Sequence, residues 1–147
     1  MKKLFISLLF ILFIGITIVL ANNNIDISDQ AKASFRKEFA GAELLEWNYM
    51  GEHQIALFIL NSYRVEAYFD ADGALEGFDR FISLNQLPLA VLKTIPLHFS
   101  NVVIRDILEI TNTDGISYLL TLEKADKSYH VKINSSGDIL KVIKDKK

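Results

Sequence analysis

The feature that most constrains the fold is a series of eight short segments with the composition of β-strands, arranged in two sets of four. Each segment is rich in aromatic and β-branched residues and is bounded by turn-forming residues, as strands are. The predicted strands are residues 43–50, 53–60, 63–69 and 74–81, followed by 102–110, 116–123, 128–133 and 138–144. A short amphipathic helix is predicted before each set, the first starting near Ser28 and the second near Leu87.

The two sets can be aligned with each other, which suggests an internal duplication. A shift of 60 residues places Phe35 on Ile95, and the two repeats cover about residues 28–82 and 83–144. Units of about 60 residues do not easily bury a core alone, so they are expected to share one sheet or to pack side by side. The predicted fold class is α+β, a tandem repeat of a short helix followed by antiparallel strands, with the helices packed on one face of the sheet.

The segment Asp70-Ala71-Asp72-Gly73 has two interpretations, a calcium-binding loop or a turn between two strands. In the alignment, a shift of 64 residues places Gly73 on Gly137, where asparagine and serine replace the aspartates. A calcium loop that begins at Asp70 requires a glutamate at its twelfth position, which is Phe81 in this chain. We therefore predict a hairpin turn, in which glycine adopts a positive φ without penalty.

The N-terminus has the pattern of a secretory signal peptide. Lys2 and Lys3 precede an apolar run from Leu4 to Leu20, and Val19 and Ala21 form a small-x-small cleavage pattern. Residues 1–21 are therefore predicted to be removed on export to the periplasm or the exterior. The alternative is a retained membrane anchor, because the run is long for a signal peptide.

The remaining residues 22–147 are predicted to form a single domain. Without the first two lysines they carry 14 basic and 18 acidic residues, a formal charge of −4, which disfavours a nucleic-acid partner. The charge is uneven, since residues 22–82 hold eleven acids and five bases while residues 83–147 hold seven acids and nine bases. The chain has no cysteine, which excludes disulfides and thiol chemistry.

No reactive motif is apparent in the sequence. The histidines His53, His98 and His130 are far apart and show no metal-ligand spacing. Nucleophile-elbow, phosphate-loop and dinucleotide-binding patterns do not occur. We therefore predict a protein that is not an enzyme and that has neither a cofactor nor a metal site.

The third strand of each set has one apolar face and one polar face, which predicts a sheet with a covered side and a wet side. The polar face carries Arg64, Glu66 and Tyr68 in one set and Ser128, His130 and Lys132 in the other. The face of Trp47 stays open, because its polar neighbours and those of the aligned Ile107 favour opposite sides, and residue preference favours the core. The predicted partner-binding residues are Trp47, Tyr49, Arg64, Tyr68, Arg105 and His130.

Several segments together resemble the PepSY-like family of small exported bacterial proteins, commonly described as β-lactamase-inhibitor-like. They are ELLEWNYM, VEAYFDADGAL, LPLAVLKTI and ISYLLTLEKAD. The resemblance covers about residues 28–144 and implies tandem modules of a helix and an antiparallel sheet. In that group, β-lactamase inhibitor proteins grip an enzyme with a concave sheet, and PepSY domains are proposed to restrain proteases.

These observations predict a non-enzymatic, exported protein-binding module that is inhibitor-like towards a periplasmic or extracellular enzyme. The alternative is a structural or assembly component of the cell envelope that associates with itself. It is suggested by the continuously apolar segment from Ile55 to Leu60 and by the opposite charge of the two halves. Contact with a membrane is expected only through the signal segment, if it is not cleaved.

Overall fold

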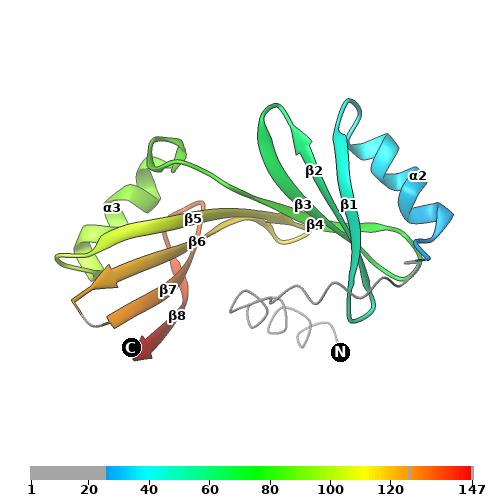
Figure 1. Cartoon of the computed structure of the whole chain (residues 1–147). Coiled ribbons are helices and arrows are strands. Elements are labelled where there is room, and N and C mark those ends of the chain that lie inside the picture. The colour runs from blue at the N-terminus through cyan, green and yellow to red at the C-terminus, as the bar shows by residue number, and fades with distance from the viewer. Residues whose placement is uncertain (1–25, 126, 147) are drawn as a thin grey trace.

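The eight predicted strands are all present, each within two residues of its predicted bounds. A computed structural model of the chain describes residues 26–125 and 127–146. The elements are α2 (Asp29–Glu38), β1 (Glu43–Met50), β2 (His53–Leu60), β3 (Tyr63–Phe69), β4 (Leu75–Phe81), the 3-10 helix η1 (Leu84–Gln86), α3 (Leu89–His98), β5 (Val103–Asn112), β6 (Gly115–Lys124), β7 (Lys127–Asn134) and β8 (Ile139–Lys146). The strands form one sheet in sequence order, and every neighbouring pair is antiparallel (Figure 1).

The predicted fold class, an α+β tandem repeat of a short helix followed by antiparallel strands, is wrong. Strands hold 55% of the structure and helices only 19%, and all eight strands belong to a single sheet. β4 pairs with β5 from Gly77 opposite Asn112 to Phe81 opposite Leu108, so backbone hydrogen bonds continue across the middle of the chain. Apolar spacing and turn residues locate strands but do not show which strand edges meet, and the prediction failed at that step.

Two clusters of apolar side chains form the core, one beneath each helix, and Figure 1 shows the helices over opposite ends of the sheet. The cluster beneath α2 consists of Ile27, Ala31, Phe35, Phe39, Ala56, Phe58, Val65, Ala67 and Phe69. The cluster beneath α3 consists of Ile82, Leu87, Val91, Ile95, Ile107, Tyr118, Leu120, Leu122, Val131 and Ile133. Since both clusters are built mainly from large side chains, burial of apolar surface is the main force that docks the helices.

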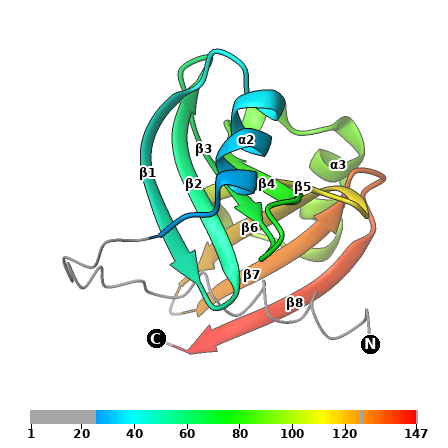
Figure 2. The same cartoon turned by 90° about the vertical axis from the view of Figure 1, so that its right-hand side faces the viewer.

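Both helices lie on the same side of the sheet, which we call the helix face. Directly opposite residues of antiparallel strands point to the same face. The pairs Ala67–Phe78, Phe78–Thr111 and Thr111–Ile116 therefore connect the sheet beneath α2 to the sheet beneath α3 on one side. No helix of the described residues packs on the other side, which we call the open face. Figure 2 shows how the strand direction turns between β1 and β8.

The apolar run in β2 is explained by burial on both faces. Ala56 and Phe58 are fully buried on the helix face, in the cluster beneath α2. Ile55 and Leu57 point to the open face and are each 8% exposed. β2 lies between β1 and β3, so its backbone is paired on both sides as well.

The predicted turn at residues 70–73 is confirmed. The Gly73 N–H donates to the Asp70 carbonyl at 3.0 Å, and the Asp70 N–H donates to the Ala74 carbonyl at 3.0 Å. Gly73 has a φ of +80°, the left-handed conformation that favours glycine. The segment therefore closes the β3–β4 hairpin.

Among the described residues, no helix is both long enough and apolar enough to cross a membrane. The predicted signal peptide, residues 1–21, lies outside the residues that the structure describes.

Candidate functional site

A row of side chains crosses the middle of the open face from β2 to β6. Its members are Ile59, Arg64, Phe81, Leu108 and Leu119. Ile59 lies opposite Arg64, Phe81 opposite Leu108, and Leu108 opposite Leu119. The row is continuous between β3 and β4 because Val65 lies opposite Arg80, which makes Arg64 and Phe81 the next pair in the register.

Phe81 is the aromatic residue of this row, and it is exposed. Its side of the sheet carries no described helix, and 56% of the residue is accessible, whereas Leu108 beside it is only 3% accessible. Exposed aromatic side chains next to buried apolar ones are typical of anchor positions in protein–protein interfaces. The basic side chain of Arg64, also exposed, lies next to it.

Beside this row, two carboxyl groups and a tyrosine form a buried polar cluster. The Tyr68 hydroxyl donates to Asp79 Oδ2 at 2.8 Å and lies 3.4 Å from Glu66 Oε2. Tyr68 and Asp79 are 5% and 4% exposed. Burial raises the pKa of Asp79 to about 7; the hydrogen bond from Tyr68 opposes that shift and the Glu66 carboxylate adds to it.

The same environment raises the pKa of Tyr68, first through burial and then through the charges of Asp79 and Glu66. The hydroxyl therefore keeps its proton and donates a hydrogen bond to Asp79, the nearer of the two carboxyl groups. Ile55 and Leu57 surround the cluster on its β2 side. The centre of the open face thus combines an apolar surface with a carboxyl group that changes charge near neutral pH.

Basic side chains border the open face towards the C-terminus. His130 Nε2 lies 2.9 Å from Asp145 Oδ2 across the β7–β8 pair, and Arg105 Nε donates to Glu123 Oε2 at 2.8 Å. Burial lowers the pKa of Lys132, and the neighbouring charge of Lys141 lowers it further, although Asp114 opposes the shift. These residues make the rim of the open face polar.

The structure brings four of the six predicted binding residues onto the open face and places the other two on the helix face. Arg64, Tyr68, Arg105 and His130 project from the open face. Tyr68 is on the predicted side of its strand, but it is buried rather than wet.

Trp47 and Tyr49 lie on the helix face. The Trp47 ring packs 5.7 Å from Phe35 and 5.6 Å from Phe69, at the border of the cluster beneath α2. A register shift between Leu44 and Glu46 interrupts the alternation of β1, and such a bulge invalidates a face assignment made by counting residues. The Tyr49 hydroxyl donates to the Asp26 carbonyl at 2.7 Å and so fastens the start of the described chain.

Sequence reasoning missed Phe81 and Asp79. A signal was present, since Phe78 and Phe81 are three residues apart in one strand and must point to opposite faces. With Phe78 beneath α2, Phe81 falls on the wet side. The burial of Asp79 could not be predicted, because Tyr68, eleven residues away, supplies its hydrogen bond.

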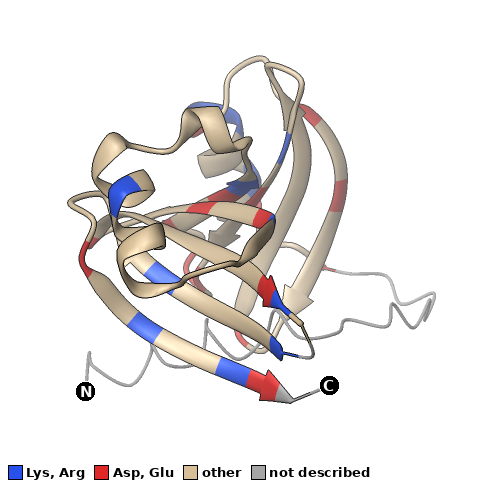
Figure 3. Ribbon diagram, turned by 90° about the vertical axis from the view of Figure 1, so that its left-hand side faces the viewer, with Lys and Arg blue, Asp and Glu red and all other residues tan. Residues whose placement is uncertain are grey.

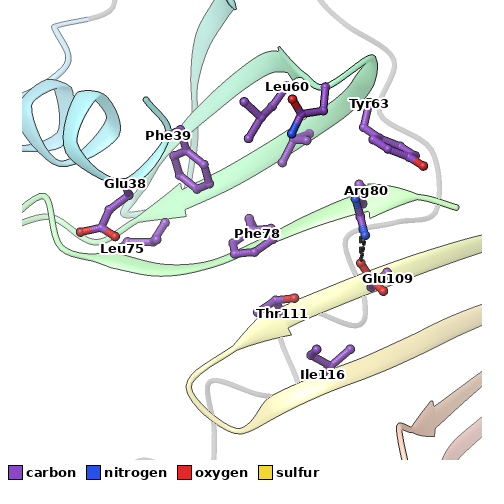
Figure 4. A pocket seen from close by; sticks show the side chains of 12 residues that line it. Glu38, Phe39, Leu60, Tyr63, Leu75, Phe78, Arg80, Glu109, Thr111 and Ile116 are labelled. Carbon is purple, nitrogen blue, oxygen red and sulfur yellow. Dashed lines mark hydrogen bonds and ion pairs between the residues drawn. The ribbon is translucent and has the colours of Figure 1, made fainter. Parts of the chain in front are cut away.

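A second surface, a cleft of about 570 Å³, opens on the helix face (Figure 4). It is lined by Glu38, Phe39, Leu60, Asn61, Tyr63, Val65, Leu75, Phe78, Arg80, Glu109, Thr111 and Ile116. Arg80 donates through Nε and Nη2 to Glu109 Oε1, both at 2.8 Å, and its guanidinium lies 4.6 Å from the centre of the Tyr63 ring. The pair neutralises its own charge, so the cleft offers mainly apolar contacts.

Within residues 26–125 and 127–146, no group of three or more histidine, aspartate or glutamate side chains is arranged to hold a metal ion. The cluster around Tyr68 contains two carboxyl groups and a hydroxyl that already bond to one another.

Several solved bacterial structures share this fold. A BLIP-like protein from Bacteroides fragilis NCTC 9343 matches with a TM-score of 0.75 at 20% sequence identity, over 84% of this chain and 89% of that one. A DUF2874 family protein from Bacteroides uniformis ATCC 8492 has a TM-score of 0.76 at 14% identity, over 81% and 90%. A protein provisionally named as periplasmic, from Bacteroides eggerthii DSM 20697, has a TM-score of 0.74 at 16% identity, over 81% and 89%.

No family model matches the sequence, and no curated protein matches it. Because the structural neighbours are at most 20% identical to the chain, the likeness establishes the fold alone. The resemblance to β-lactamase-inhibitor-like proteins is confirmed at this level, whereas the PepSY-like name remains a prediction.

Proposed function

We propose that the chain is a non-enzymatic, exported protein-binding module that uses its open face to hold a protein partner. The observation that carries the proposal is the exposed Phe81 side chain on the open face, which lies between Arg64 and the buried Leu108 in the register of the sheet. Aromatic and arginine side chains at the centre of a desolvated patch provide most of the binding energy in known interfaces.

The anatomy of the open face supports this proposal. Its centre combines apolar side chains with the buried Tyr68–Asp79 pair, while charged and polar side chains such as His130, Lys132 and Arg105 lie towards one end. An apolar centre with a polar rim is typical of specific interfaces between proteins. The sheet supplies a rigid support, since the central strands β2 to β7 are each paired on both sides.

Export and inhibitor-like action are the finer parts of the proposal. Export is supported by the predicted signal peptide at residues 1–21 and by the name of the Bacteroides eggerthii neighbour. An enzyme of the periplasm or the exterior as the partner is supported by the BLIP-like name of the Bacteroides fragilis neighbour. PepSY-like proteins are proposed to restrain proteases, so a protease is one candidate enzyme.

The experiment is affinity capture from an envelope extract of the host, with the purified protein and two open-face variants as baits. Phe81→Ala and Arg64→Glu are expected to lower partner recovery about tenfold or more, because an anchor contributes on the order of 2 kcal/mol. Leu97→Ala is the matched control, since Leu97 is an apolar residue of α3 and is 79% exposed.

Equal recovery by wild type, Phe81→Ala and Arg64→Glu would show that the open face is not the binding surface. Loss of the partner with Leu97→Ala instead would assign binding to the helix face. Tyr68, one of the predicted binding residues, is an unsuitable position for this test. Replacing it leaves the buried Asp79 without its hydrogen-bond donor.

A further inference from the structure

The sheet has two unpaired edges, and their side chains carry opposite charges. Within the described residues, β1 and β8 are the outer strands and each has a neighbour on one side only. An edge strand presents a row of free N–H and C=O groups, which can pair with a strand of another chain. What such an edge accepts depends on the side chains that border it.

The β1 edge is acidic and the β8 edge is basic. Glu43 and Glu46 are exposed on β1, and Lys141 and Lys144 are exposed on β8. Figure 3 shows red bands on one outer strand, whereas the other outer strand carries mostly blue bands and a red end. Asp145 is the acidic residue of β8, and its carboxylate lies 2.9 Å from His130 Nε2 of the neighbouring strand. One carboxylate stands against the two exposed lysines of this strand.

Both edges also carry exposed apolar side chains. Leu44 and Leu45 of β1 are 42% and 50% exposed, and Leu140 and Val142 of β8 are 54% and 46% exposed. Pairing of the two edges would cover part of the surface of these side chains. Apolar burial would therefore add to the attraction between the charges.

The direction of the strands suits pairing between copies. The sheet has eight strands, and each is antiparallel to the next, so β1 and β8 run in opposite directions. When a second copy is rotated to follow the twist of the sheet, its β8 can lie antiparallel to β1 of the first copy, which continues the alternation of strand directions. The helix face of one copy then continues into the helix face of the next.

From these observations we infer that the chain binds a second copy of itself head to tail, with β8 of one molecule added to β1 of the next. One molecule carries both complementary edges, whereas β1 against β1 or β8 against β8 brings like charges together. Such a contact joins two different surfaces, and it produces rings or linear chains of molecules. The inference is independent of the proposed function of the open face.

Lysines on an edge strand also serve in many proteins to prevent pairing. If the lysines only prevent pairing, the protein should be a monomer, and changing the charges of β1 should not alter its sedimentation. Complementary pairing predicts the reverse, because reversing either edge should abolish association. A charge-reversal cycle distinguishes the two.

The experiment is sedimentation velocity of the purified protein over a range of concentrations, at low salt and at about 0.5 M salt, where charge attraction is screened. The wild type is expected to sediment faster as concentration rises, and less so at high salt. Glu43→Lys/Glu46→Lys and Lys141→Glu/Lys144→Glu are each expected to remain monomeric. An equimolar mixture of the two variants, and the chain with all four changes, should associate again.

A wild type that stays monomeric throughout the concentration range would overturn the inference. Association that persists in both charge-reversed variants would overturn it as well. Recovery of association in the mixture requires both variants to be folded, so misfolding cannot be mistaken for a lost contact.

Discussion

Asp79 is a carboxyl group buried in the middle of the open face, and its environment sets a pH dependence that can be measured. Its pKa is raised to about 7, mainly by burial, whereas an aspartate in the unfolded chain titrates near 3.9. Between these values the folded state holds a proton that the unfolded state has lost. The contribution of Asp79 to the free energy of unfolding is therefore greatest below about pH 4. It falls as the pH rises to about 7, by about 1.4 kcal/mol per pH unit.

We predict that Asp79→Asn removes this loss of stability between about pH 4 and pH 7. Asparagine stays neutral and can still accept the hydrogen bond from Tyr68. The variant should be more stable than the wild type at pH 8, by up to about 4 kcal/mol, and the advantage should shrink towards pH 5. Urea unfolding at several pH values measures it. Asp106→Asn, which removes an exposed carboxyl from the open face, is the control, and a pH-independent effect of Asp79→Asn would refute the assignment.

At the scale of single residues, alternation within a strand predicts the face to which a side chain points more reliably than it predicts how deeply that side chain is buried. Tyr68 was placed on its correct side, but its contact with Asp79 depends on the pairing of β3 with β4, which the sequence does not state. The face of Trp47 stayed open because the polar neighbours of the aligned Ile107 favoured the opposite side, and one of them, Arg105, lies at a bulge in β5. Phe81 could have been found, since its distance from Phe78 places it on the side opposite α2.

At the scale of elements, the start of α2 is fixed to the sheet by a small set of specific contacts. The Ser28 N–H donates to Gln54 Oε1 at 2.7 Å, and Gln54 Nε2 donates to the Asp70 carbonyl at 2.9 Å. Gln54 thus connects the first turn of the helix, β2 and the β3–β4 turn. Gly73 lies in this turn, and a Cβ atom there would come within 2.5 Å of the Ala31 nitrogen.

We predict that Gly73→Ala destabilises the protein more than Gly51→Ala does. Both glycines have a positive φ, +80° at Gly73 and +63° at Gly51. Holding alanine in this conformation therefore costs a similar free energy at both positions, about 1 kcal/mol. Around Gly51 nothing lies within 4 Å of the added carbon, whereas at Gly73 the backbone of α2 must move. The difference should be about 1–3 kcal/mol in the free energy of unfolding. Equal values from urea titration would show that α2 does not rest on this turn.

The limits of the elements were predicted well because each depends on local signals. The first helix was expected to start near Ser28, and the Ser28 Oγ caps it by accepting the Ala31 N–H at 3.1 Å. The turn glycines and the apolar runs likewise marked the strands. The pairing of β4 with β5 carries no local signal, and for this reason the sequence left open whether the two sets of strands share one sheet or pack side by side.

At the scale of the whole molecule, one sheet joins two separate apolar cores. The cluster beneath α2 and the cluster beneath α3 share no residue. They are connected by the backbone ladder between β4 and β5 and by the contact of Arg80 with Glu109 at 2.8 Å. Breaking that ladder would expose the buried Asp79 and Leu108, so we expect the two halves to unfold together.

This expectation can be tested with Trp47, the single tryptophan of the chain, which packs at the cluster beneath α2. Leu120→Ala removes a fully buried side chain from the other cluster and should cost about 2–5 kcal/mol. If the sheet unfolds as one unit, the midpoint of the Trp47 fluorescence transition shifts by the same amount as that of the far-ultraviolet circular dichroism. Val142→Ala, at an exposed position of β8, is the control and should shift neither. A Trp47 transition that stays at the wild-type midpoint while the circular dichroism shifts would mean that the ladder between β4 and β5 does not couple the two cores.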